Sequence, residues 1–194
     1  MARRARATSP GLAKGEQRQA EILAVARGLL VEEGYDAFVM REVCARVGLT
    51  LGNLQYYYAT RDDLLEAVVR AEFARNQSEI DALAAAKAPP RRRLAAIARH
   101  LIDVWAHEGG RVYAVMSLLA LHQARFATLH GEIYAAFYEK LLPVLKEIRP
   151  RASKAELRRT ARLITTMIDG ALVQVPGRTF VDDAIAVIVE LAER

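Results

Sequence analysis

One short segment of the sequence, residues 50–57, combines side chains that form hydrogen bonds with side chains that stack. After Thr50 it contains Leu51, Gly52, Asn53, Gln55, Tyr56 and Tyr57. If the segment is helical, consecutive residues lie about 100° apart, so these side chains cannot all point into one core. An exposed phenol can donate a hydrogen bond to a phosphate oxygen, and an exposed amide can read the edge of a base. The chemistry indicated is recognition of DNA.

The neighbouring residues predict two short helices that would position this segment. The apolar residues that can meet in one small core are Val43, Val47, Leu49 and Leu54. Residues four apart share a helix face, and a turn at Gly48 can use the positive φ that glycine adopts without strain. The hydroxyl of Thr50 can then cap the following helix. Together these signals predict a helix-turn-helix.

The three consecutive tyrosines allow two interpretations. They could close the small core while the amides stay solvated, or they could contact DNA. The spacing of Tyr58 from Leu54 places it on the buried face, so we assign it to the core. We expect Tyr56 and Tyr57 to contact DNA.

Residues 15–73 resemble the N-terminal domain of the TetR family of bacterial transcriptional regulators. The matching features are the opening helix with Ile22, Ala26, Leu29 and Leu30, the Gly34-Tyr35 break, the Met40-Arg41-Glu42-Val43 helix start, the Thr50-Leu51-Gly52-Asn53-Leu54 segment with three aromatics after it, and the Thr60-Arg61-Asp62-Asp63-Leu64 helix entry. The rest of the chain is similar only in its length and helical character. The resemblance implies a three-helix DNA-binding domain joined to a helical domain for ligand binding and dimerisation.

The resemblance also implies DNA contacts from Arg41, Thr50, Leu51, Gly52, Asn53, Gln55, Tyr56, Tyr57 and Arg61. We expect the two arginines to anchor phosphates, the tyrosines to clamp the backbone, and Leu51, Asn53 and Gln55 to face bases.

The sequence departs from the family pattern at three positions. Val39 stands where the family usually has a serine or threonine cap, so we expect no side-chain cap on the second helix. Gln55 replaces a frequent tyrosine and can change the base preference, whereas Arg61 replaces a frequent lysine and keeps its charge.

The composition predicts an all-α protein with a substantial core. Hydrophobic residues make up 53% of the chain, alanine and leucine dominate, and the net charge of +5 suits a polyanionic partner. The longest apolar stretch, residues 112–121, is far shorter than the roughly 20 residues that span a bilayer, and no apolar run follows the basic start. The single cysteine, Cys44, excludes an intrachain disulfide. We expect a cytoplasmic protein that does not enter a membrane.

Prolines, glycines and charge runs divide the chain. Residues 1–14 contain Arg3, Arg4, Arg6 and Lys14 without an acid and predict a disordered basic arm, which could track phosphates or simply aid solubility. Residues 15–60 form the predicted DNA-binding domain and residues 61–194 the helical domain. In the latter we predict helices over 61–86, 91–107, 111–125, 127–149, 153–175 and 179–193, with Gly109-Gly110 as one of the breaks.

Catalytic and metal-binding motifs are incomplete. His130-Gly131-Glu132 lacks the paired cysteines of zinc deaminases, and His107-Glu108 lacks the second histidine of a zinc protease motif. We expect no enzymatic activity, no cofactor and no metal.

The helical domain contains two further candidate sites. By resemblance we expect an effector pocket for an apolar or aromatic small molecule, lined by Trp105, Tyr113, Met116, His122, Gln123, Tyr134, Phe137 and Asp169. Apolar residues also cover much of the last two helices, which predicts a homodimer interface at Ile164, Met167, Ile168, Leu172, Phe180, Ala184, Ile188 and Leu191. An ordinary buried helix pair is the alternative for the second set.

The function predicted is a ligand-responsive repressor that binds a palindromic operator in double-stranded DNA as a homodimer. Two alternatives remain open: an activator or inducer-independent regulator of the same fold, and a helical ligand-binding or interaction module without DNA binding.

Overall fold

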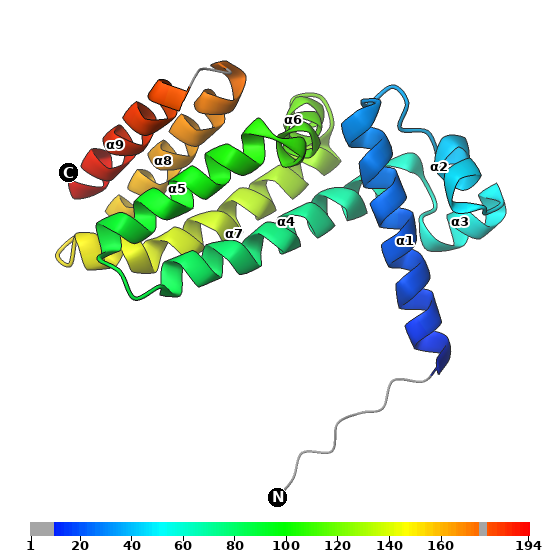
Figure 1. Ribbon diagram of the computed structural model, residues 1–194, viewed down its shortest axis with the longest axis horizontal. Coiled ribbons are helices and arrows are strands. Elements are labelled where there is room, and N and C mark those ends of the chain that lie inside the picture. The colour runs from blue at the N-terminus through cyan, green and yellow to red at the C-terminus, as the bar shows by residue number, and fades with distance from the viewer. Residues whose placement is uncertain (1–9, 175–177) are drawn as a thin grey trace, which may run out of the picture. The chain divides into compact units, whose positions relative to one another are not determined.

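The protein is all-α, as predicted. The computed structural model describes residues 10–174 and 178–194, except for the side chains of residues 10–13, 105, 171–174, 178 and 179. The described part contains helices α1 (Pro10–Glu32), α2 (Met40–Val47), α3 (Leu51–Tyr57), α4 (Arg61–Ala85), α5 (Pro90–Ala106), α6 (Glu108–Ala120), α7 (Ala124–Ile148), α8 (Lys154–Gln174) and α9 (Arg178–Glu193) (Figure 1). The chain divides into two units, one ending at Ala71 and one beginning at Glu72.

The turn of the helix-turn-helix forms for the predicted reasons. Gly48 ends α2 with a φ of 70°, a left-handed conformation that favours glycine, and the Leu49 N–H donates to the Cys44 carbonyl at 3.0 Å. Thr50 begins the next helix, and its hydroxyl accepts a hydrogen bond from the Asn53 N–H at 3.2 Å. Val39 provides no side-chain cap for α2, as its residue type predicts.

The first unit is held by a small apolar core. Its fully buried side chains include Ile22, Ala26, Leu29, Leu30, Phe38, Val43, Leu54, Leu64 and Leu65. Val47 is also buried, whereas Leu49 is only partly so. Tyr58 is buried too, which confirms its assignment to the core.

The beginning of α4 belongs to the first unit. Arg61 donates from Nε to the Phe38 carbonyl at 2.6 Å and from its terminal nitrogen to the Tyr35 carbonyl. Thr60 and Asp63 cap the helix reciprocally, because the Thr60 N–H donates to the Asp63 carboxylate at 2.9 Å and the Asp63 N–H donates to the Thr60 hydroxyl at 3.1 Å. The division between units therefore falls inside α4, and not at residue 60 where we predicted it.

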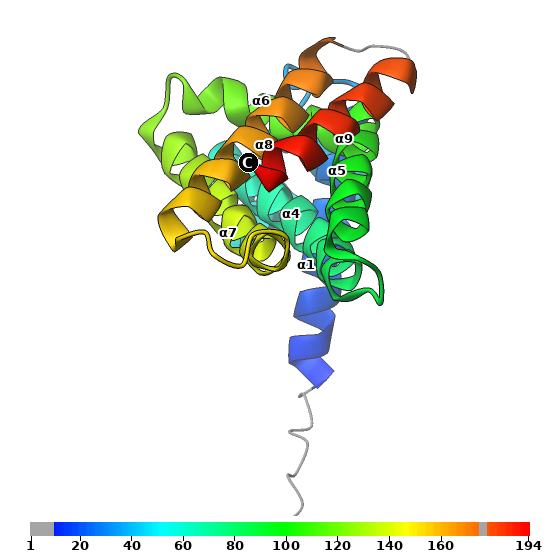
Figure 2. The same cartoon turned by 90° about the vertical axis from the view of Figure 1, so that its left-hand side faces the viewer.

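The second unit is a helical bundle with α5 and α7 at its centre. Helix α5 packs against α6, α7, α8 and α9, and α7 packs against α6 and α8 (Figures 1 and 2). The largest buried side chains between these helices include Leu94, Ile97, Met116 and Phe126. Asp81 of α4 forms an ion pair with Lys140 of α7. In the described part of the chain, none of the helices is both long and apolar enough to cross a bilayer.

Helix boundaries agree with the sequence predictions except at three places. Helix α1 begins at Pro10, so residues 10–14 are helical and not part of a disordered arm; residues 1–9 lie outside the described residues. The break near residue 127 lies instead at residues 121–123. Gly109 and Gly110 do not separate two helices, because both lie buried in the first turn of α6.

Gly109 is needed for packing. A Cβ atom placed there would lie 2.7 Å from Cγ1 of Val104 and 3.0 Å from Oε1 of Glu72, a side chain that is 3% exposed. We therefore expect Gly109→Ala to lower the free energy of unfolding by about 1–3 kcal/mol, as overpacking does. Gly131→Ala in α7 is the matched control, since a Cβ there meets nothing within 4 Å and should stabilise the helix by up to about 1 kcal/mol. Thermal unfolding of both variants tests this, and equal midpoints would contradict it.

Candidate DNA-binding surface and ligand cavity

In helix α3 the side chain of one residue is buried and those of most others are exposed. Leu54 is 0% exposed, whereas Gly52, Asn53 and Gln55 are exposed. Leu51 is 38% exposed. The outer face of α3 therefore presents amide groups and an apolar side chain beside a glycine, without any acidic residue in the helix. Such a face can approach the edges of bases without repelling phosphates.

Aromatic and hydroxyl groups flank this face. Tyr56 is 85% exposed and Tyr57 is partly buried, and the two rings meet edge to face with their centroids 5.3 Å apart. Both the Tyr56 phenol and the Thr50 hydroxyl can reach an external acceptor. Arg41 in α2 is exposed as well. These positions suit contacts with a phosphate backbone.

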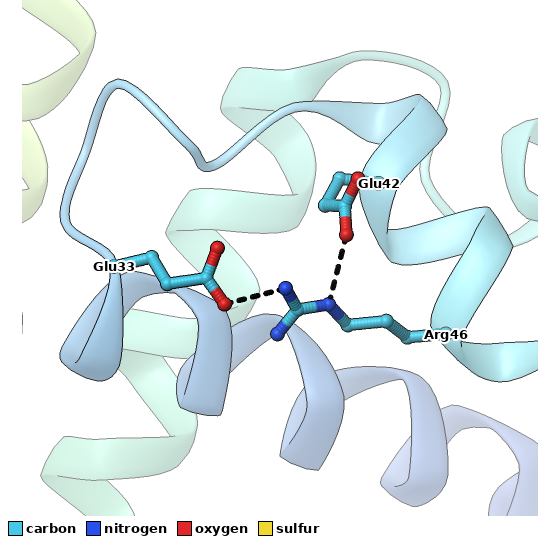
Figure 3. Close-up of polar contacts among 3 residues, drawn as sticks. All are labelled: Glu33, Glu42 and Arg46. Carbon is cyan, nitrogen blue, oxygen red and sulfur yellow. Dashed lines mark hydrogen bonds and ion pairs between the residues drawn. The ribbon is translucent and has the colours of Figure 1, made fainter.

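Arg46 fixes α2 against α1, a role that the sequence reasoning missed. Its Nε donates to Glu42 in the same helix at 3.0 Å, and its terminal nitrogen donates to Glu33, one residue after the end of α1 (Figure 3). The hydrogen bonds with Glu33 and Glu42 raise the pKa of Arg46. The spacing of Glu42 and Arg46 is a sequence signal for a pair within one helix, but the partner in α1 depends on the tertiary fold.

Arg61 does not have the place expected of a phosphate anchor. Its guanidinium carbon lies 4.0 Å from the centroid of the Tyr35 ring, and its N–H groups donate to the two backbone carbonyls described above. Arg61 is only partly exposed because these contacts hold it against the first unit. We therefore assign Arg61 a structural role and correct the prediction that it contacts DNA.

The second unit contains a mostly apolar cavity of about 40 Å³. Its lining residues come from five helices: Phe73, Asn76, Ile80, Leu101, Tyr113, Ile133, Tyr134, Phe137, Thr165, Ile168 and Asp169. Four of the predicted pocket residues are therefore brought together, namely Tyr113, Tyr134, Phe137 and Asp169. The residues from α4 were missed, because a sequence does not show which face of that long helix meets the bundle.

The other predicted pocket residues lie elsewhere. Met116 is fully buried but does not line the cavity. His122 is exposed and Gln123 partly so, both in the connection between α6 and α7, so the prediction that they line the pocket was wrong. The side chain of Trp105 lies outside the described residues.

Asp169 and Tyr134 form the polar end of the cavity. The Tyr134 hydroxyl donates to Oδ2 of Asp169 at 3.0 Å. Burial raises the pKa of Asp169 to about 6, and the hydrogen bond from Tyr134 opposes that shift. Burial also raises the pKa of Tyr134 well above its ordinary value, and the nearby Asp169 carboxylate adds to the effect. Tyr134 is therefore neutral, and Asp169 titrates near neutral pH.

The predicted dimer residues whose side chains are described fall into two groups. Ile164, Ile168, Ala184 and Ile188 are buried within the chain, so they cannot contact a partner and the prediction was wrong for them. Met167, Phe180 and Leu191 are partly exposed, and the side chain of Leu172 lies outside the described residues. Among the described side chains of these helices, the exposed large apolar ones are Leu163 and Val187. Leu163 and Leu191 line the same surface hollow between α8 and α9, together with charged residues that include Arg159 and Glu156.

Two parts of the chain match protein-family models. Residues 22–68 match the model described as bacterial regulatory proteins of the tetR family, and residues 90–194 match the model described as the C-terminal part of a BetI-type transcriptional repressor. No curated protein sequence matches the chain.

Solved structures of other regulators share this fold, and two of them serve as examples. One is a TetR transcription regulator from Haloarcula marismortui, which is 20% identical with a TM-score of 0.77, covering 92% of this chain and 97% of that one. The other is a transcriptional regulator from Rhodococcus sp. Rha1, which is 18% identical with a TM-score of 0.75, covering 90% of this chain and 95% of that one.

Proposed function

The chain belongs to the TetR family of bacterial regulatory proteins, and from its site geometry we propose that it is a ligand-responsive repressor acting in the cytoplasm. The family fold is that of a DNA-binding transcriptional regulator. The single observation that carries the proposal is the outer face of α3, where Asn53, Gln55 and Tyr56 are exposed on a short helix whose buried side is anchored by Leu54. These side chains face solvent, where a DNA partner can reach them.

Each exposed group has a separate task in the proposed complex. Leu51, Asn53 and Gln55 face bases, since amides can form paired hydrogen bonds with adenine and an apolar side chain can contact the thymine methyl group. Gly52 lets the helix backbone approach the groove closely. Phosphate contacts come from Arg41, Thr50, Tyr56 and Tyr57.

A homodimer on a palindromic operator fits the exposed apolar surface. Leu163 and Val187 are exposed, and Met167 and Leu191 partly exposed, on α8 and α9; packing of these two helices against those of a second copy would form a two-fold interface. A two-fold dimer places its recognition helices in successive major grooves, about 34 Å apart.

The cavity supports a response to a small molecule. Apolar and aromatic side chains dominate its lining, so an effector with an apolar or aromatic part suits it. At about 40 Å³ the cavity must enlarge to admit an aromatic ring, since a cavity that binds benzene measures roughly 150 Å³. Ligand binding therefore requires rearrangement of the helices around it, and any such change that disfavours the DNA-bound state lowers DNA affinity.

Arg41→Ala tests the proposed phosphate contacts. We expect affinity to fall for operator and scrambled DNA alike, and the slope of log affinity against log salt to become shallower by about 2, because one phosphate contact is lost in each subunit of the dimer. Arg92→Ala is the matched control, since Arg92 is an exposed arginine of the second unit. Fluorescence anisotropy over a salt series measures both effects. A slope equal to that of the unmodified protein would contradict the assignment of Arg41.

A further inference from the structure

Two buried polar atoms of opposite hydrogen-bonding character belong to residues that line the cavity. Nδ2 of Asn76 on α4 is a donor, and Oδ1 of Asp169 on α8 is an acceptor. Both atoms are shielded from solvent, and neither has a hydrogen-bond partner in the described part of the chain. Buried polar atoms are nearly always hydrogen-bonded, so this pair indicates a molecule that accepts from the first atom and donates to the second.

The other polar groups around the cavity do not match these two atoms. The Tyr134 hydroxyl donates to Oδ2 of Asp169 at 3.0 Å, and the Thr165 hydroxyl donates to the Ala161 carbonyl at 2.7 Å. Tyr113 is neutral, because burial raises its pKa to about 12. The remaining lining residues are apolar: Phe73, Ile80, Leu101, Ile133, Phe137 and Ile168. The lining therefore presents an unmatched donor and an unmatched acceptor within a mainly apolar wall.

A donor paired with an acceptor favours a neutral ligand over an ion. A cation would satisfy the Asp169 carboxylate but could not accept from Asn76, and the carboxylate would repel an anion. A secondary amide carries no charge and has one N–H donor and one carbonyl acceptor. These two groups lie on separate atoms and point in opposite directions, which suits partners on two different helices. An amide can therefore satisfy both buried atoms at once.

We propose that the cavity binds a neutral secondary amide, whose N–H donates to Oδ1 of Asp169 and whose carbonyl oxygen accepts from Nδ2 of Asn76. This inference rests on the proposed ligand response and names its chemical class. The free volume of about 40 Å³ has room for only a few non-hydrogen atoms, so the amide group is the part of a larger effector that the existing cavity accepts.

N-methylacetamide and methyl acetate form a matched pair of probes. The two molecules have the same shape and size, and they differ only in the N–H of the amide, which an oxygen replaces in the ester. Burial raises the pKa of Asp169 to about 6, so the carboxylate is ionised at pH 7.5. Ligand-observed NMR titration of the full chain at that pH should show at least about tenfold tighter binding of the amide, as a hydrogen bond to a charged acceptor supplies.

Variants of the two residues separate the two hydrogen bonds. Asp169→Leu removes the acceptor and should abolish the preference for the amide. Asp103→Leu, the same change at an exposed carboxylate on α5, should retain it. Asn76→Leu removes the donor to the carbonyl oxygen that both probes contain, so it should weaken the binding of both by about fivefold while the preference for the amide remains.

Three results would overturn the inference. They are equal binding of the two probes by the unmodified chain, a preference for the amide that persists in Asp169→Leu, and unchanged affinity for both probes in Asn76→Leu. Equal binding is the result that a cavity filled only by water would give. If Asp169→Leu does not fold, Asn76→Leu and the unmodified chain decide.

A DNA titration of the unmodified chain separates this inference from the proposed function. Operator binding together with equal affinity for the two probes would refute only the amide ligand. Absence of specific DNA binding would refute the proposed repressor whatever the probes show.

Discussion

Replacing both exposed amides of α3, Asn53→Ala together with Gln55→Ala, should remove most of the preference for operator over scrambled DNA. Each paired amide contact with a base contributes about 1–3 kcal/mol of discrimination, so the ratio of the two affinities should fall at least about tenfold. Affinity for scrambled DNA should change little, because the phosphate contacts remain. Competitive anisotropy titrations with both DNAs measure the ratio.

The fold should be unaffected by this double change. Asn53 and Gln55 are exposed, and the Asn53 N–H that meets the Thr50 hydroxyl belongs to the backbone. Gln19→Ala, an exposed amide on α1, is the matched control and should leave the ratio unchanged. If the double variant discriminates as well as the unmodified protein, these amides do not read bases.

Leu54→Ala should destabilise the first unit by about 2–5 kcal/mol. Leu54 is 0% exposed, and truncation of a fully buried leucine costs both its transfer free energy and the cavity left behind. That is a large fraction of the 5–15 kcal/mol that stabilises a typical domain, so affinity for all DNA should fall with the folded population of the unit. Hydrogen exchange of the α2 and α3 amides measures this local stability.

Leu51→Ala in the same helix provides the comparison. Leu51 is 38% exposed, so the same truncation there should change stability by no more than about 0.5 kcal/mol. It should affect DNA discrimination instead. Similar hydrogen-exchange rates of the α2 and α3 amides in the two variants would contradict the conclusion that Leu54 stabilises the first unit more than Leu51 does.

Local signals explain why the helix-turn-helix could be predicted from sequence. Gly48 and Thr50 act through their own backbone and the next few residues, and both have the predicted conformation and hydrogen bond. Ser153 and Glu156 form an equally local contact at the start of α8, where the Ser153 N–H donates to the Glu156 carboxylate at 2.7 Å and the Glu156 N–H donates to the Ser153 hydroxyl at 3.3 Å. Such contacts span three or four residues and need no knowledge of the fold.

Contacts between distant segments were not predictable in the same way. Arg61 was expected to bind phosphate by its place in a motif, but carbonyls of Tyr35 and Phe38 hold it. Gly109 resembles a helix break in sequence, yet it allows the close approach of Val104 and Glu72. Apolar residues cover much of α8, but their pattern could not show whether Ile164 faces the bundle or a second subunit.

Specific DNA binding is tested most directly by titrating the purified protein against the intergenic DNA upstream of its own gene and against a scrambled control, over a series of salt concentrations. The proposed function predicts tight binding to the first DNA only, two chains per site, and a linear fall of log affinity with log salt. Equal and weak binding to both DNAs, lost at physiological salt, would contradict a sequence-specific regulator and leave only the attraction of a basic protein for a polyanion.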